Sequence, residues 1–300
     1  MMLTGILAGL AAGALWGAVF VVPRMIPDVS SVDLTAGRFL SYGVMASLVM
    51  GLTWRSHTWP TLRQALTALG MSVLGATAYY LLLALSIHRA GTEVPTLIIG
   101  TIPLWVMLFG KPAGLKWSAL LPGLALTAGG LMIMVIATRS ELSAVPSAGD
   151  TFWWGVALAS ASMVCWTVFA ILNAAWLKRH PEIRASEWSN WVGIATGVGA
   201  LLLWGVAGSP PNELLALEDG ALIAIICIAT GVGSGWAGSI LWNIASQRLS
   251  ASLCGQLIVS ETLFALFYAF VGYGVWPHWP QLLASAVFVL GIIASIRAHK

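Results

Sequence analysis

Apolar stretches about as long as a bilayer crossing recur through the whole chain, separated by short polar breaks. A helix that crosses a bilayer needs about 20 apolar residues. Hydrophobic residues make up 59% of the chain and charged residues 8%, whereas soluble domains hold about 25% charged residues. A β-barrel would show short alternating segments instead. The sequence therefore predicts an all-α membrane protein with ten spans, at residues 4–24, 33–53, 68–88, 94–110, 117–137, 153–176, 187–207, 220–246, 251–273 and 281–297.

The few charged residues are distributed unequally between the two sides of this arrangement. If the N-terminus is cytoplasmic, the opposite side holds only Arg24, Arg89 and Arg139. The cytoplasmic breaks and tail hold Arg55, Arg63, Lys111, Lys116, Lys178, Arg179, Arg184, Arg248, Arg297 and Lys300. Because basic residues concentrate in cytoplasmic loops, we predict cytoplasmic termini and a location in the cell membrane, the inner membrane in a Gram-negative cell. The basic excess gives no reason to expect nucleic-acid binding.

Weak self-similarity relates the first five spans to the last five. Matched pairs occur in chain order: Gly5 and Gly155, Trp16 and Trp166, Asp33 and Glu187, Gly43 and Gly197, and segments 86–89 and 245–248. Because five is odd, a duplicated half must be inserted upside down, as in transporters with inverted repeats. We expect an N-terminal five-helix repeat at 1–138, a linker at 139–150 and an inverted C-terminal repeat at 151–300.

Three segments of this pattern, residues 5–21, 89–110 and 247–274, resemble the ten-helix drug/metabolite transporter superfamily with paired EamA-type halves. The tryptophan-rich chain as a whole is similar to the YddG-type exporters of aromatic and other neutral amino acids. This resemblance implies alternating access and a cargo of that class. The first span lacks the acidic residue that the small multidrug proteins of the superfamily use for proton exchange, so proton coupling does not carry over.

Polar and aromatic residues form matching stripes on the third and eighth spans. In each stripe, successive residues are three, four and four positions apart, which places them on one helical face. The stripes are Thr77, Tyr80, Ala84 and His88, and Trp236, Ser239, Asn243 and Gln247. We predict that they line a shared cavity and contact substrate. The alternative is hydrogen bonding between helices, which is common in membrane bundles.

Two tryptophans occupy matched positions inside spans, away from the interfacial belt where tryptophan is usual. Trp16 is followed by Phe20, and Trp166 by Phe169 and Asn173. These residues either pack in the core or line a substrate site, where aromatic faces could hold an aryl ring or an ammonium group.

Four further features concern individual residues of the predicted spans. Glu261 lies well inside a span and is either a protonation switch or a hydrogen-bonded packing residue. Pro103 predicts a kink, which could be a gating hinge or a fixed bend. The four-residue ladder Gly5, Gly9, Gly13 and Gly17 predicts a close helix crossing. Arg38, Arg89 and Arg248 lie near span ends, where they either reach headgroups or, less often, contact substrate or a gate.

The chain shows no nucleotide-binding loop, metalloprotease motif, serine elbow or paired Cys/His spacing. We therefore expect no enzyme activity, cofactor or metal, and a partner list limited to the bilayer and a small molecule, with a monomer sufficient. The predicted function is export of aromatic and other neutral amino acids through a central aromatic-lined cavity. The alternatives are export of drug-like compounds or other metabolites, an intramembrane enzyme using Glu261 and His88, or a receptor without transport activity.

Overall fold

The computed structural model describes residues 2–300 apart from positions 21, 27, 56–57, 92, 138–149, 218 and 275. The described ranges contain helices and no β-strand. The predicted linker lies outside them except for Asp150, where α9 begins. The α-helices are α1 (Met2–Gly17), α2 (Val22–Met25), α3 (Ser31–Leu52), α4 (Leu62–Ser72), α5 (Ala78–Ala90), α6 (Glu93–Gly100), α7 (Ile102–Phe109), α8 (Trp117–Ala137), α9 (Asp150–Arg179), α10 (Ala185–Ala207), α11 (Pro211–Leu215), α12 (Gly220–Thr230), α13 (Gly238–Arg248), α14 (Ala251–Tyr273) and α15 (Trp279–Ala298).

Eight helical segments of the described chain are long and apolar enough to cross a membrane. They are Met2–Phe20, Leu62–Ala90, Trp117–Ile136, Thr151–Arg179, Ala185–Ala207, Gly220–Arg248, Ala251–Gly272 and Trp279–Ala298. Two predicted spans are not among them. The α6 and α7 pair gives a shorter apolar stretch, Val94–Phe109, and α3 carries Asp33 and Arg38. The helices fall where the sequence predicts them, and the count of ten spans stays a prediction.

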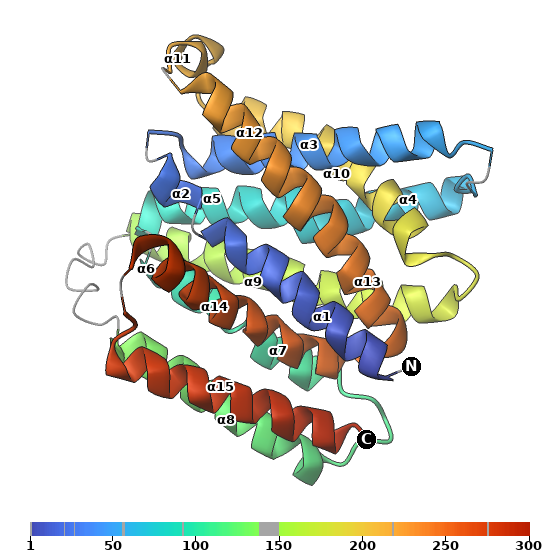
Figure 1. The fold of residues 1–300 in the computed structure, drawn as a ribbon, viewed down its shortest axis with the longest axis vertical. Helices are drawn as coiled ribbons and strands as arrows, with labels where there is room; N and C mark the ends of the chain where they lie inside the picture. Colours follow the sequence, from blue (N-terminus) through green and yellow to red (C-terminus); the bar gives the residue numbers. More distant parts are fainter. Residues whose placement is uncertain are drawn as a thin grey trace.

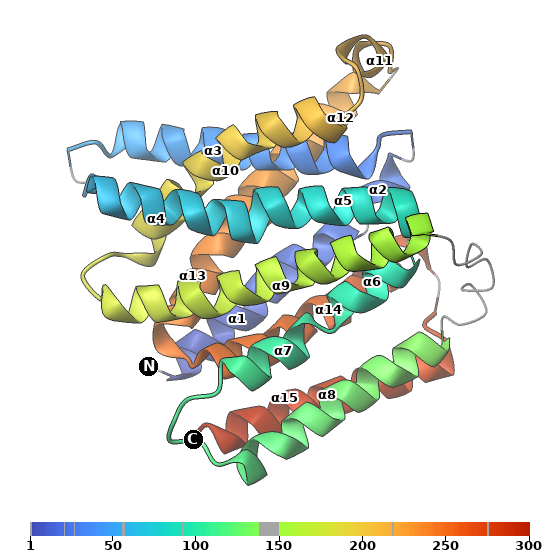
Figure 2. The ribbon, with the colours of Figure 1, turned by 180° about the vertical axis from the view of Figure 1, so that it is seen from behind.

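The long helices run side by side, and both chain ends lie at the same end of the bundle (Figures 1 and 2). We call this the termini end, and the other the opposite end. The connections from α3 to α4, α7 to α8 and α9 to α10 lie at the termini end as well. The main packing pairs are α3 with α10, α5 with α9, α8 with α15, and α1 with both α13 and α14. The α8 and α15 pair forms one edge of the bundle (Figure 1).

Glycines set the closest of these crossings. A Cβ atom added to Gly9 of α1 would lie 2.7 Å from Leu257 Cδ1, and one added to Gly17 would lie 2.8 Å from the Glu261 carbonyl oxygen. The predicted close approach along the glycine ladder is therefore confirmed, with α13 and α14 as the neighbours. At the crossing of α3 and α10, a Cβ on Gly43 would lie 2.6 Å from Gly197 Cα.

Two helices change their winding midway, and a third is interrupted. The π-helical segment η2 (Val73–Thr77) joins α4 to α5, and η3 (Gly231–Ala237) joins α12 to α13. A π-helical turn holds more residues than an α-helical one, so it rotates the faces that follow. The helix is interrupted at Thr101, between α6 and α7, and Pro103 lies in the first turn of α7. The predicted kink is therefore seen as an interruption.

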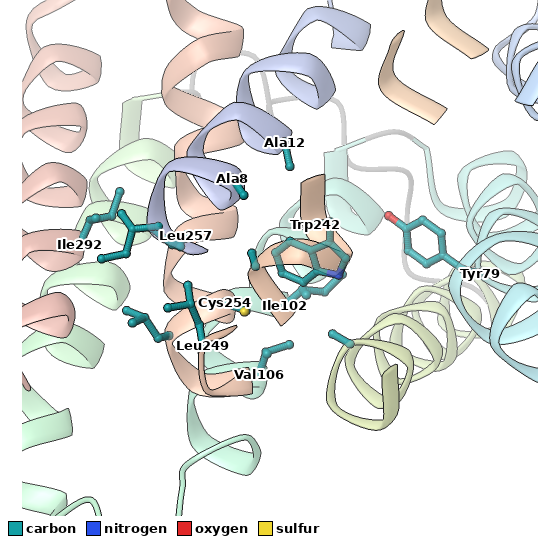
Figure 3. Close-up of a cluster of buried hydrophobic side chains, with 14 residues drawn as sticks. Ala8, Ala12, Tyr79, Ile102, Val106, Trp242, Leu249, Cys254, Leu257 and Ile292 are labelled. Atoms are coloured by element: carbon teal, nitrogen blue, oxygen red, sulfur yellow. The ribbon is translucent and has the colours of Figure 1, made fainter. Parts of the chain in front are cut away.

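The largest buried apolar cluster lies where α1, α7, α13 and α14 meet. Figure 3 shows Leu249, Cys254 and Leu257 on one side of Trp242 and Tyr79 on the other. The Trp242 side chain is 3% exposed, so it is part of this core while also reaching the centre of the bundle. The cluster thus forms a rigid wall behind the site described next.

Candidate central cavity

A cavity of about 500 Å³ lies among the helices of the bundle. This volume is in the range of small-molecule sites, about 300–1,000 Å³. Residues from α1, α3, α5, α9, α10, α13 and α14 all contribute to its lining. Its aromatic lining consists of Trp16, Phe20, Phe39, Tyr42, Tyr79, Tyr80, Trp166, Phe169, Trp188 and Trp242. The cavity can therefore enclose a ligand with a large apolar or aromatic part.

The structure places most of the predicted site residues in this lining. They are Trp16, Phe20, Tyr80, Trp166, Phe169, Asn173, Ser239, Asn243, Pro103 and Glu261. They come from both halves of the chain, so the cavity is not built by one half alone. Substrate contact by these side chains stays a prediction.

Five residues of the predicted stripes lie outside the lining, and Ala84 of α5 is one of them. Trp236 Nε1 donates to Asn190 Oδ1 at 2.8 Å, and Gln247 Nε2 donates to the Ile183 carbonyl oxygen at 2.9 Å. Thr77 packs against Gly199 of α10, and His88 is exposed near the end of α5. Thr77 and Trp236 belong to η2 and η3, where the three- and four-residue spacing of an α-helix no longer keeps residues on one face. For Trp236 the structure thus favours the alternative, hydrogen bonding between helices, whereas Gln247 bonds to the connection between α9 and α10.

Three tryptophans from different helices form an aromatic wall of the cavity. The Trp242 ring centroid lies 5.3 Å from that of Trp16 and 6.1 Å from that of Trp166. Trp16 Nε1 also donates to the Ser234 carbonyl oxygen at 3.0 Å. Such spacings are typical of stabilising aromatic pairs. Trp242 lies outside the predicted stripe.

Hydrogen bonds between side chains cover the cavity at the termini end. Trp188 Nε1 donates to Asn173 Oδ1 at 2.7 Å, and Asn173 Nδ2 donates to Asn243 Oδ1 at 2.8 Å. Asn243 Nδ2 continues the chain to Ser189 Oγ at 2.8 Å. Trp188 and Asn173 are almost fully buried. This asparagine network therefore ties α9, α10 and α13 together beneath the cavity.

The cavity reaches the surface toward the opposite end. Its lining there includes Phe20 at the end of η1, which is 62% exposed, and the exposed Ser31 in the first turn of α3. Thr35 follows Ser31 by one turn, and Thr96 of α6 faces the same region. A solute thus has access from the opposite end and meets buried side chains at the termini end.

Arg38 and Glu261 are the only charged side chains in the lining formed by the described residues. Arg38 Nη2 donates to the Tyr80 hydroxyl at 2.8 Å, and its guanidinium carbon lies 5.0 Å from the Phe39 ring centroid. Glu261 is partly exposed and lines the cavity. Both interpretations of this residue, a protonation switch and a hydrogen-bonded packing residue, stay predictions.

Comparison with known proteins agrees with this architecture. A model of the EamA-like transporter family matches residues 3–136. The chain is 32% identical to "Inner membrane protein YtfF" of Escherichia coli (strain K12) over 319 aligned residues, 99% of this chain and 96% of the relative. The chain belongs to the EamA-like transporter family.

A solved structure described only as a crystal structure of a protein shares the fold of this EamA-like chain. Its TM-score is 0.78 at 17% sequence identity, with 100% of this chain and 99% of the other covered. At that identity the likeness concerns the fold alone. The EamA-like protein is a multi-pass membrane protein of a transporter family.

Proposed function

We propose that this EamA-like protein exports aromatic and other neutral amino acids by alternating access through the central cavity. One observation carries the proposal: a large aromatic-lined cavity holds a single cation, Arg38, and a single carboxylate, Glu261, among the described residues. A zwitterion with an apolar or aromatic side chain complements that combination. A phosphorylated sugar would need several basic groups.

The proposed mechanism requires ten spans in two inverted halves, 1–138 and 151–300, and four features support this arrangement. The family model covers residues 3–136, almost the whole first half. Gly43 and Gly197, matched in the sequence, meet each other where α3 crosses α10, as equivalent residues on a twofold axis would.

The acidic residues at the starts of α3 and α10 supply the third feature. Asp33 Oδ1 accepts from Ser209 N, just after α10, at 2.9 Å. Glu187 Oε1 accepts from Thr58 N, shortly after α3, at 3.3 Å. Each helix thus anchors the segment that follows its partner, which is the reciprocal contact expected of an inverted pair.

The two π-helical segments supply the fourth feature. The sequence matches residues 86–89 with 245–248, and at the same offset η2 (Val73–Thr77) falls within η3 (Gly231–Ala237). π-Helical turns are rare and frequent at functional sites. Their recurrence at matched positions beside the cavity favours a common origin of the halves.

The orientation follows from charge. Arg55, Lys111, Lys116 and Arg184 lie in connections at the termini end. With basic loops inside, the termini face the cytoplasm and the cavity opens to the outside. The lining comes from one chain, so a monomer suffices.

Counterflow of labelled phenylalanine in proteoliposomes tests the proposal. We expect saturable counterflow that Trp166→Ala reduces at least about tenfold, because that side chain forms part of the aromatic wall. Trp153→Ala is the matched control, since Trp153 lies on the same helix, is 61% exposed and is absent from the lining. The absence of counterflow for every neutral amino acid would overturn the cargo assignment and direct the search to drug-like compounds and other metabolites.

A further inference from the structure

Arg38 is buried within a span and uses few of its donors. Its side chain is 8% exposed, and its Nε atom is buried without a partner. A guanidinium carries five N–H donors, and among the described residues only the Tyr80 hydroxyl accepts a hydrogen bond from it. A cation in this setting is costly unless a ligand or partner satisfies it. The remaining donors are available to an anionic group.

The surroundings of Arg38 provide further donors on the same helical face. Ser31, Thr35 and Arg38 follow at spacings of four and three along α3 and all line the cavity. The same three residues also line a recess of about 80 Å³ between α3 and α12. Hydroxyl groups and a guanidinium together are the usual donors to a carboxylate.

Glu261 and Arg38 line the same cavity, yet among the described residues the two side chains do not form an ion pair. The two charges therefore face the cavity separately, and each remains open to an opposite charge on a ligand. The rings of Phe39 and Tyr80 lie beside the Arg38 guanidinium, with centroids 5.0 Å and 5.4 Å from its central carbon, and they exclude water from that side. An electrostatic contact gains strength in such surroundings.

We infer that Arg38 binds the α-carboxylate of the cargo, with Ser31 and Thr35 as additional donors, so that the carrier selects molecules with a free carboxylate. Tyr80 is a positioning residue, because its hydroxyl holds the guanidinium toward the cavity. The inference rests on the proposed function and narrows the range of cargo. We expect amines, amides and esters with the same aromatic group to bind poorly.

Competition against labelled phenylalanine counterflow tests the inference. The competitors are phenylalanine and phenylalaninamide, which differ only in the carboxylate. For the wild-type protein we expect the amide to compete at least about tenfold less well. In Arg38→Gln the KM for phenylalanine should rise at least about tenfold, while inhibition by the amide changes little, so that the preference for the acid disappears. The preference of Arg38→Lys for the acid should lie between those of the wild-type protein and Arg38→Gln, because lysine keeps the charge and loses the planar fork.

Arg63→Gln is the matched control, since Arg63 is exposed on α4 outside the cavity lining. If Arg38 had a purely structural role, Arg38→Gln would weaken the binding of the acid and of the amide alike, and that result would overturn the inference. A KM for phenylalanine within twofold of the wild-type value would overturn it as well. If Arg38→Gln does not fold, equal competition by acid and amide at the wild-type protein still overturns it. Failure of the proposed function looks different, because the wild-type protein would then show no counterflow of any neutral amino acid.

Discussion

The two halves of the chain are alike where they anchor each other and different where they close the cavity. Asp33 and Glu187 make reciprocal contacts at opposite ends of the crossing of α3 and α10. The asparagine network at the termini end belongs to the second half alone, through Asn173, Trp188, Ser189 and Asn243. In the first half the positions matched to Asn243 and Trp188 hold Ala84 and Leu34.

The helix containing Pro103 differs as well. In the first half the helix is interrupted at Thr101 between α6 and α7, whereas α14 of the second half is continuous from Ala251 to Tyr273. The shared contacts define the crossing about which both halves are arranged. Under the proposed mechanism, we expect the unshared ones to stabilise closure at the termini end over closure at the opposite end. Sequence divergence between similar halves can thus set which side of a carrier is open at rest.

The largest expected effect comes from the contact that both halves share. In Gly43→Leu the new side chain meets the backbone of Gly197, which cannot move aside without separating α3 from α10. We expect a loss of about 3 kcal/mol or more in the free energy of unfolding, measured by thermal unfolding in detergent. Gly51→Leu on the same helix is the control, because a Cβ at Gly51 meets no atom within 4 Å. Equal stability of the two variants would contradict the central role of this crossing.

The network at the termini end should be the next most sensitive feature. Asn243→Ala removes two hydrogen bonds and leaves Asn173 Nδ2 and Ser189 Oγ without these partners. We expect a loss of about 2 kcal/mol in unfolding free energy. Gln247→Ala, one turn further along α13, removes only the bond to the Ile183 carbonyl and should cost about half as much. If Asn243→Ala leaves the unfolding free energy unchanged, the termini end is not stabilised by this network.

The reciprocal anchors allow a direct comparison of the halves. Glu187→Gln and Asp33→Asn each replace a buried carboxylate that accepts hydrogen bonds from the chain after the partner helix. We expect each to lower the unfolding free energy by about 1 kcal/mol, and the two losses to agree within about 0.5 kcal/mol. A loss confined to one of the two variants would argue against equivalent halves.

The smallest effect is expected at the helix break. Proline fits the first turn of a helix, so Pro103→Ala should change the unfolding free energy by less than about 1 kcal/mol and leave the rate of counterflow unchanged. This outcome corresponds to a fixed bend. A marked fall in the transport rate, with substrate affinity unchanged, would instead identify Pro103 as part of a hinge.

The sequence by itself determined the positions of the helices and the close crossing of α1 with its neighbours. The apolar runs mark the helices to within a few residues, because a bilayer crossing demands an uninterrupted stretch of that kind. The ladder from Gly5 to Gly17 predicted the close approach of α1 to its neighbours, since glycine leaves room for it. The sequence also predicted several cavity residues, Trp16, Trp166 and Asn173 among them.

Only the tertiary structure decided which side chains face the cavity. The spacing of Trp236 and Gln247 matched that of Ser239 and Asn243. Trp236 lies in η3, which rotates the helical face, and it bonds to Asn190 of α10, whereas Gln247 bonds to the Ile183 carbonyl in the connection between α9 and α10. Arg38 and Trp242 emerged as cavity residues because distant helices bring Tyr80, Trp16 and Trp166 beside them. A helical period fixes which residues share a face, and only packing fixes what that face meets.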